Sequence, residues 1–210
     1  MTDNAATFNA TLFIVSAPSG AGKTSLLREL VPADDRLVMS VSHATRAMRS
    51  GEQDGIHYHF VSVERFEELV GEGAFLEHAQ VFDNYYGTAE AAVREQLVRG
   101  SDVVLEIDWQ GARQVRHRFP EAVSIFIAPP SIEALRERLS GRGQDSPEVV
   151  ERRMADARSE LSHFPEYDYL VINDDFDVAL AELRAIVVAQ RLREPRQAAR
   201  FSTELASMLG

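Results

Sequence analysis

The sequence lacks cysteine altogether, and it also lacks long apolar runs. Without cysteine, neither a disulfide framework nor a thiolate metal site can form. No apolar stretch approaches the length of a membrane-spanning helix, so we expect no membrane span. The first basic residue is Lys23, whereas secretory signals and organellar transit peptides need earlier positive charge. We therefore expect a cytoplasmic protein.

Positive charge is also scarce. The chain has 22 Lys and Arg against 33 Asp and Glu, which gives a formal net charge of -11. Such a chain is not expected to bind nucleic acid, and any phosphate-bearing ligand must meet locally concentrated positive charge. Lys23 is the only lysine, since every other fixed cation is an arginine. Either this position requires an ammonium group or the lysine was retained by chance.

The 210 residues fit one domain with a full hydrophobic core. Apolar, β-branched runs predict buried strands at Thr11–Ser16, Leu37–Val41, Asp102–Ile107, Ala122–Ala128 and Tyr169–Ile172. Helical patterns fall between and after them, at Lys23–Leu30, Ala89–Arg99, Gln110–Arg118, Ser131–Leu139 and Phe176–Arg193. Continuous apolar strands that alternate with helices predict an α/β fold, with a parallel sheet covered on both faces.

Two stretches interrupt this alternation. Residues 42–88 are polar and rich in Arg, His, Tyr and Gly, and we interpret them as an inserted lobe. Within that lobe we expect a helix at Val63–Glu72 and a small half-exposed sheet from His57–Val61 and Phe75–Val81. Residues 140–165 are dense in charge, and we interpret them as a mobile flap. The tail, 194–210, is compatible with a terminal helix whose role the sequence leaves open.

A phosphate-binding motif follows the first predicted strand. Its residues are Ala17, Pro18, Ser19, Gly20, Ala21, Gly22, Lys23 and Thr24, which match the P-loop pattern except for alanine at the first glycine position. Glycines let the backbone amides converge on phosphate oxygens, and the next helix adds its positive end. Lys23 can reach the β- and γ-phosphates, and the Thr24 hydroxyl can ligate Mg²⁺. The motif predicts a nucleoside triphosphate site, which GTPases, ATPases and small-molecule kinases share.

Arginine, tyrosine and acidic residues in and beyond the inserted lobe indicate a second ligand. Arg46 and Arg49 are three residues apart, and their planar forks match a phosphate dianion better than lysine does. Glu77 and Asp108 are acceptors only. Guanine presents an N1–H and an exocyclic amine as donors and adenine lacks that pair, so these carboxylates favour guanine.

The order and spacing of several segments give the chain its family resemblance. They are Ser40–Arg46, Gly51–Glu52, Tyr58–Val61, Phe75–Ala79, Tyr85–Thr88, Glu106–Gly111, Arg142–Gly143 and Asn173–Asp174. Together with the P-loop, these segments resemble the bacterial-type guanylate kinase family from about residue 11 to 190. The resemblance implies a P-loop nucleoside monophosphate kinase fold with a five-stranded parallel sheet. It also implies a core of 11–41, 89–130 and 166–210, a GMP-binding lobe at 42–88 and a lid at 131–165.

The resemblance also implies a role for each matching position. The residues implied to hold the GMP phosphate are Arg46, Arg49, Tyr58 and Tyr86, with Glu52 orienting the arginines. Those implied to read the guanine are Ser42, Glu77, Thr88 and Asp108. Glu106 and Asp108 would help to position Mg²⁺, and Asn173 would contact the adenine of ATP. Arg142 and Arg153 would close on the transferring group, with Arg138 nearby.

The resulting hypothesis is transfer of the γ-phosphoryl group of ATP to GMP, giving ADP and GDP, with dGMP a plausible second acceptor. One alternative is a kinase for another nucleoside monophosphate, against which Glu77 and Asp108 argue. The other is a catalytically inert, guanylate-kinase-like peptide-binding module. Such a module is expected to lack the P-loop lysine and the lid arginines, which this chain has. Homo-oligomerisation stays open.

Overall fold

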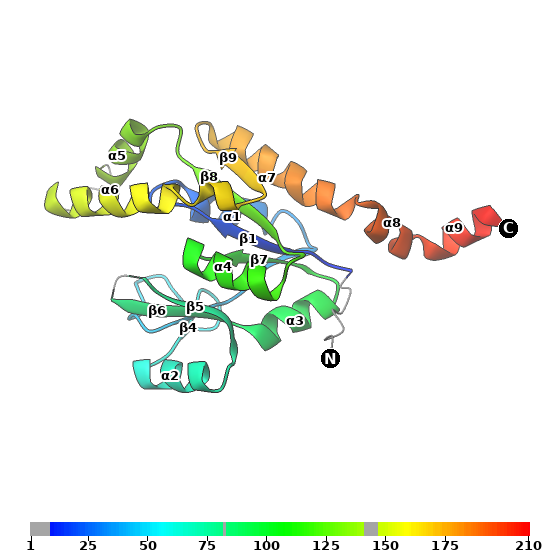
Figure 1. The fold of residues 1–210 in the computed structure, drawn as a ribbon, viewed down its shortest axis with the longest axis horizontal. Helices are drawn as coiled ribbons and strands as arrows, with labels where there is room; N and C mark the ends of the chain where they lie inside the picture. Colours follow the sequence, from blue (N-terminus) through cyan, green and yellow to red (C-terminus); the bar gives the residue numbers. More distant parts are fainter. Residues whose placement is uncertain (1–8, 82, 141–146) are drawn as a thin grey trace.

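The computed structural model describes residues 9–81, 83–140 and 147–210 (Figure 1). Its centre is a five-stranded sheet in the order β2-β7-β1-β8-β9, in which every neighbouring pair is parallel. The strands are β1 (Leu12–Ser16), β2 (Leu37–Met39), β7 (Asp102–Glu106), β8 (Val123–Ala128) and β9 (Tyr169–Ile172). The predicted α/β fold with a five-stranded parallel sheet is therefore confirmed.

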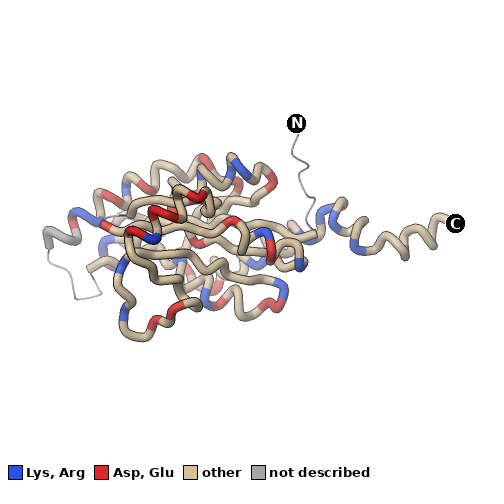
Figure 2. Tube along the Cα trace, turned by 90° about the horizontal axis from the view of Figure 1, so that it is seen from below, with Lys and Arg blue, Asp and Glu red and all other residues tan. Residues whose placement is uncertain are grey.

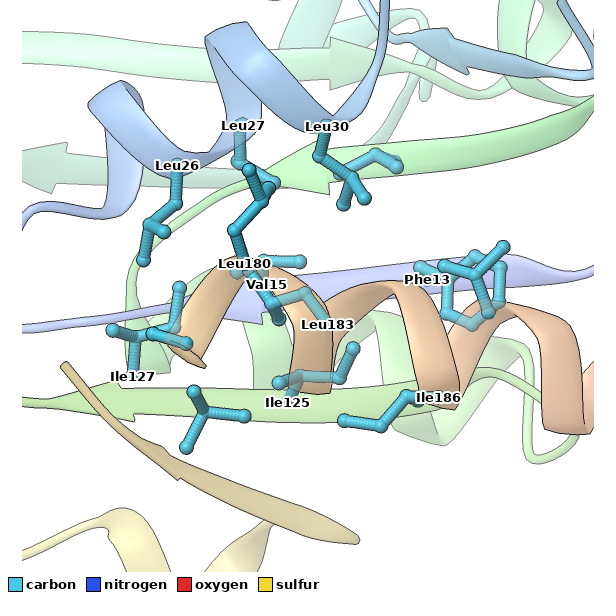
Figure 3. Close-up of a cluster of buried hydrophobic side chains, with 14 of the residues drawn as sticks. Phe13, Val15, Leu26, Leu27, Leu30, Ile125, Ile127, Leu180, Leu183 and Ile186 are labelled. Atoms are coloured by element: carbon cyan, nitrogen blue, oxygen red, sulfur yellow. The ribbon is translucent and has the colours of Figure 1, made fainter. Parts of the chain in front are cut away.

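Helices cover both faces of this sheet because its central strands are apolar on both sides. Phe13 and Val15 of β1 pack into one cluster with α1 (Lys23–Leu30) and α7 (Phe176–Arg191). Figure 3 shows this cluster, in which the leucines of α1 and α7 meet strand residues such as Ile125. Leu12 and Ile14 face the other way, toward α3 (Glu90–Val98) and α4 (Trp109–Arg118). The alternation along β1 thus builds two cores, one on each face.

A second, four-stranded sheet forms within the inserted segment. Its order is β4-β3-β6-β5, with β4 (His59–Phe60), β3 (His43–Ala44), β6 (Asn84–Ala89) and β5 (Phe75–Val81). α2 (Val63–Gly71) packs against it through Phe66, whose ring lies 4.7 Å from that of Phe75 and 5.6 Å from that of Tyr85. This aromatic contact gives the small sheet a core of its own.

One irregularity in this sheet has consequences for the site. Phe75 pairs with Ala89 and Glu77 pairs with Thr88, so β5 has one more residue than β6 between the two pairs. Such a bulge re-aims side chains that regular alternation would send elsewhere. As a result, Phe75, Leu76 and Glu77 are all buried in succession.

The segment we interpreted as a mobile flap contains a long helix. After α5 (Ile132–Ser140), the chain forms the 15-residue α6 (Pro147–Leu161) and the short η1 (Phe164–Glu166). Met154 and Ala157 of α6 pack on Leu135 and Leu139 of α5. These few apolar residues lie within a densely charged stretch, so the sequence did not predict the helix at 147–161, and the mobility of the flap stays a prediction.

Other predicted boundaries differ by a few residues. The strand expected at Leu37–Val41 ends at Met39, and the helix expected to reach Arg193 ends at Arg191. Of the expected strand His57–Val61, only His59–Phe60 joins the sheet, because the backbone N–H of His57 bonds to the Gln53 carbonyl in a turn and Tyr58 forms an isolated bridge with Asp54. No helix in the described ranges is both long and apolar enough to span a bilayer.

The C-terminal residues form α8 (Glu194–Arg200) and α9 (Ser202–Leu209), which project away from the body (Figures 1 and 2). A buried ionic network attaches the start of this extension to the sheet. Asp102, 1% exposed, accepts from the Thr11 backbone N–H at 2.6 Å, from Arg191 Nε at 2.6 Å and from Arg196 Nη2 at 3.1 Å.

This network predicts the response to Asp102→Ala. The change removes the buried carboxylate that Arg191, Arg196 and the Thr11 N–H share, so the free energy of unfolding should fall by about 3–5 kcal/mol in urea titrations. Glu95→Ala is the matched control, because it breaks an exposed pair with Arg99 and should cost less than about 1 kcal/mol. Equal losses in the two variants would show that the network does not hold the fold together.

Candidate active site

A cavity of about 350 Å³ opens at the carboxyl edge of β1 and β7, between the main sheet and the inserted sheet. The P-loop, α6 and the start of α4 complete its walls. Eight expected site residues outside the P-loop and lid lie on those walls: Ser42, Arg46, Arg49, Tyr58, Glu77, Tyr86, Glu106 and Asp108. Glu52, Thr88, Arg138 and Asn173 lie behind the walls, and Arg142 lies outside the described residues.

Two glycines give the P-loop its curvature. Gly20 and Gly22 have φ values of 90° and 93°, a region that residues with a Cβ rarely adopt. At Gly22, an added Cβ would lie 2.4 Å from Nδ2 of Asn173, which fills the space directly behind the loop. The loop therefore runs straight into α1, whose free amide end faces the cavity.

The two chemically active P-loop side chains both reach toward β7. The ammonium of Lys23 is half-buried and donates to the Ile107 carbonyl at 3.2 Å. The Thr24 hydroxyl donates to Oε1 of Glu106 at 2.5 Å. Hydroxyl and carboxylate oxygens are ligands that Mg²⁺ accepts, so Thr24 and Glu106 fit a magnesium site beside the phosphate loop.

Positive charge on the opposite wall is held in place by a carboxylate. Arg46 donates to both oxygens of Glu52, at 2.7 and 2.6 Å, and Glu52 also accepts from the Arg49 backbone N–H at 2.8 Å. The paired Arg46 guanidinium lowers the pKa of Glu52 to about 2, so the pair stays ionised at neutral pH. Its geometry is that of a bidentate fork.

Two tyrosines flank this fork. The Arg46 guanidinium lies 4.9 Å from the centre of the Tyr58 ring, and the Tyr58 and Tyr86 rings are 5.9 Å apart, edge to face. Burial raises the pKa of Tyr58, so its hydroxyl keeps its proton. The wall therefore presents two phenols beside the guanidinium groups of Arg46 and Arg49, a set that matches phosphate oxygens.

A relay of hydroxyl groups holds the most deeply buried carboxylate of the site. Glu77 is 3% exposed, and its Oε1 accepts from the Thr88 hydroxyl at 2.5 Å. The Ser42 hydroxyl lies 3.0 Å from that of Thr88. Since Thr88 donates to Glu77, it accepts from Ser42. Burial, with the nearby charge of Asp108, raises the pKa of Glu77 to about 7.

Asp108 both caps a helix and lines the cavity. It is the N-cap of α4, where Oδ1 accepts from the Gly111 backbone N–H at 2.8 Å. Gly111 leaves room for Glu77, because an added Cβ there would lie 2.5 Å from Glu77 Oε2. The Asp108–Gly111 turn thus places the carboxylates of Asp108 and Glu77 at the cavity. The sequence did not indicate that Gly111 makes room for Glu77.

Two residues of α6 contact one residue of the P-loop. Arg153 Nη2 donates to the Ser19 hydroxyl at 2.9 Å, and Glu160 Oε2 accepts from the Ser19 backbone N–H at 3.1 Å. They are seven residues apart and so lie on the same face of the helix. The sequence predicted Arg153 as a site residue but not Glu160, although their seven-residue spacing could have indicated that both lie on one helix face.

Asn173 and Arg138 support the loop from behind. Asn173 is 5% exposed and donates through Nδ2 to the Ala21 carbonyl at 2.7 Å. Arg138 Nη2 donates to the Asn173 carbonyl at 2.9 Å. The buried position of Asn173 does not support direct contact with adenine, because its amide is already bonded to the loop backbone.

The segment that follows α6 is anchored on α4. Glu166 accepts from Arg113 and Arg116, at 2.6 and 2.8 Å, and these contacts lower its pKa to about 2. The Trp109 and His163 rings stack with centroids 3.9 Å apart. The Trp109–His163 stack therefore links the end of the lid-side segment after α6 to Trp109, the residue that follows Asp108.

Comparisons with known proteins agree on one family. The family model described as guanylate kinase matches residues 9–190. The chain is 59% identical to the guanylate kinase of Alkalilimnicola ehrlichii over 95% of this chain and 98% of that protein. It is 58% identical to that of Vibrio cholerae, over 95% and 97%. It also resembles the crystal structure of guanylate kinase from Anaplasma phagocytophilum, with a TM-score of 0.74 and 33% identity over 90% and 89% of the two chains.

The raised pKa of Glu77 predicts a pH-dependent stability. Because the folded pKa exceeds the unfolded one, the protonated carboxyl favours the folded state below about pH 4.5, and this contribution is lost as the pH rises through about 7. The loss should be about 3 kcal/mol. Urea titrations across this range should show it in the wild type and not in Glu77→Gln. Identical pH profiles for the two proteins would contradict the assignment.

Proposed function

The chain belongs to the guanylate kinase family and transfers a phosphoryl group from ATP to GMP, and we propose that the 350 Å³ cavity is where this transfer takes place. One observation carries the proposal. A phosphate loop, a pair of arginines and a pair of carboxylates line the same cavity from separate parts of the chain. Those groups complement a triphosphate, a phosphate monoester and a guanine respectively.

GMP would enter on the side of the inserted sheet. Its phosphate would lie against Arg46 and Arg49, with Tyr58 and Tyr86 donating through their hydroxyls. The two-point contact from Glu52 supports this role, because it fixes the Arg46 fork before the substrate arrives. Preorganised donors lose little freedom on binding.

The guanine would be read at the other end of that wall. Glu77 and Asp108 would accept from guanine N1–H and the exocyclic amine, with Ser42 beside them. Thr88 is fully buried, so we assign it to holding Glu77 rather than to touching the base. An ionised carboxylate cannot donate, so it rejects bases that present an acceptor there.

ATP would occupy the P-loop side. The amides of Ala17–Thr24 would cradle its phosphates, and Lys23 would neutralise charge between the β- and γ-phosphates. Mg²⁺, held by Thr24 and Glu106 with the nucleotide phosphates, supplies charge neutralisation when bound. Asn173 and Arg138 would act on ATP through the shape of the loop, since both bond to backbone there or next to it.

The transfer itself needs no general base. The GMP phosphate has a second pKa of ~6, so it is largely ionised at neutral pH and can attack directly. The protein's contribution is positioning and charge stabilisation. Arg153 is assigned to the transferring group because it already reaches the P-loop, and Arg142 is assigned with it on the family pattern. Glu160 would hold the lid helix in register with Ser19.

We further propose that the enzyme works in the cytoplasm in purine nucleotide metabolism and recycles GMP. Two other functions are weaker candidates. An inert peptide-binding module would not need Lys23, which bonds to the Ile107 carbonyl beside the cavity, or the hydrogen bond between Thr24 and Glu106. A kinase for AMP or dTMP would not need the two carboxylates Glu77 and Asp108 on the cavity wall beside the base.

A coupled assay of ADP release, run with each nucleoside monophosphate in turn, tests the proposed function. GMP should be the preferred acceptor, with dGMP second and AMP, CMP and dTMP far slower. Comparable kcat/KM values for GMP and AMP would overturn it.

Lys23 is predicted to be essential for turnover. Lys23→Ala removes the ammonium from the β/γ bridge, so kcat should fall by about 10²-fold or more while the urea midpoint barely changes. Lys23→Arg should also fail, because a guanidinium is larger and differently hydrated. Arg99→Ala, on an exposed helix, is the control. A folded Lys23→Ala protein with near-normal kcat would rule out the P-loop assignment.

Glu77 is predicted to set the choice of base. Glu77→Gln replaces an acceptor with a group that also donates. The activation free energy derived from kcat/KM for GMP should therefore rise by about 1–3 kcal/mol. IMP lacks the exocyclic amine and AMP lacks both donors, so their values should change less. Steady-state kinetics with all three nucleotides decide the matter, and equal factors would refute the role of Glu77.

Gly111 is predicted to matter for GMP without mattering for the fold. In Gly111→Ala the new Cβ would press on Glu77 Oε2 and displace it, so KM for GMP should rise about tenfold while KM for ATP stays unchanged. Alanine favours a helix by about 1 kcal/mol over glycine, so stability should not collapse. Gly71→Ala on α2 is the matched control, since nothing lies within 4 Å of its added Cβ. Unchanged GMP kinetics in Gly111→Ala would contradict the account.

A further inference from the structure

A second cavity, of about 230 Å³, lies at the end of the main sheet opposite the P-loop. Asp102, on its wall, is the first residue of β7, and β1 and β2 also begin at this edge. The P-loop follows the carboxyl end of β1 instead. The two cavities are therefore separated by the length of the strands, and Figure 1 places the C-terminal helices at the far end from α5 and α6.

Arginines dominate this second cavity. Its charged and amide lining residues are Arg36, Arg191, Arg196, Arg200, Asp102 and Asn9. Figure 2 shows basic residues where the C-terminal extension leaves the body. Four guanidinium groups in one small cavity are unexpected in a chain whose net charge is -11.

The local charges do not balance. Arg191 pairs with Asp34 and Asp102, and Arg196 pairs with Asp102 as well. Within the described ranges, neither Arg36 nor Arg200 has an ion pair with a carboxylate. Four arginines thus face two carboxylates, which leaves an excess of positive charge around the cavity.

One buried donor on the wall has no acceptor. Arg191 is 8% exposed, its Nε donates to Asp102 at 2.6 Å and its Nη1 donates to Asp34 at 2.5 Å. Its Nη2 is buried and has no hydrogen-bond partner in the part of the chain that the structure describes. The two carboxylates therefore leave part of this guanidinium unsatisfied, which is costly and adds to the excess of positive charge at the cavity.

We propose that this cavity binds a phosphate group, either as free phosphate or diphosphate or as the diphosphate end of a nucleotide. Arginine forks match tetrahedral oxyanions, and the Asp34–Arg191–Asp102 network holds the central fork rigid. The volume is below that of pockets that enclose drug-sized ligands, so any nucleoside would remain outside. The bound anion would join α7 and α8 to the start of the sheet.

Hydrogen exchange with mass spectrometry, with and without pyrophosphate at constant ionic strength, tests the proposal. Pyrophosphate should slow exchange in peptides covering 100–104 and 190–201, and Lys23→Ala should keep this protection while losing protection at 17–24. Arg36→Gln/Arg200→Gln should weaken the affinity read from the first pair of peptides by about tenfold. Both side chains are exposed, so the variant should keep its fold.

Arg65→Gln/Arg99→Gln is the matched control, because it removes the same charge from exposed helices elsewhere. Protection confined to 17–24 would overturn the proposal. An equal loss of pyrophosphate affinity in the two double variants would also overturn it, because that result would indicate bulk electrostatics only. GDP and pyrophosphate, compared on the Lys23→Ala protein, identify the source. Protection at 190–201 by both supports a nucleotide-borne diphosphate, and protection by pyrophosphate alone supports a free anion.

Discussion

The burial of the Glu77 carboxylate between the inserted sheet and α4 is the constraint on which the rest of the site depends. Taking a carboxylate out of water is unfavourable, and the raised pKa of Glu77 expresses that cost. The fold tolerates it because Thr88, itself supported by Ser42, donates to the carboxylate. A guanine would offer the remaining donors. The unliganded carboxylate thus lacks donors that the proposed guanine contact would supply.

The arginines of the site also depend on neighbouring groups that hold them in place. Around this site, carboxylates hold the cations in place, as Glu52 holds Arg46 and Glu166 holds Arg113 and Arg116. The first pair fixes a guanidinium on the cavity wall, and the second anchors the segment that follows the helix carrying Arg153 and Glu160. Electrostatic stabilisation of a transferring phosphoryl group requires such groups to be fixed beforehand. The arrangement supports catalysis by positioning rather than by proton transfer.

The sequence predicted the main sheet and its helices because continuous apolar strands and capped helices leave strong local patterns. The P-loop motif and the short spacing of Arg46 and Arg49 are also local patterns, and the structure places these residues on one cavity. The bulge at Phe75–Glu77, the space that Gly111 leaves and the helix at Pro147–Leu161 were not predicted. Each depends on contacts between residues distant in the chain, or on a few apolar positions within a charged stretch. The burial of Asn173 and Thr88 is likewise a tertiary property that the sequence does not show, and it is the reason why we propose indirect roles for both.

Proton release on GMP binding tests the central claim most directly. Calorimetric titrations below pH 7, repeated in buffers of different ionisation enthalpy, count the protons exchanged. If guanine requires the ionised form of Glu77, the wild type should release about one proton more than Glu77→Gln, and the titration of the GMP phosphate itself cancels between the two. Equal proton counts for the two proteins would show that Glu77 does not ionise to receive the base, and the account of guanine selection would fail.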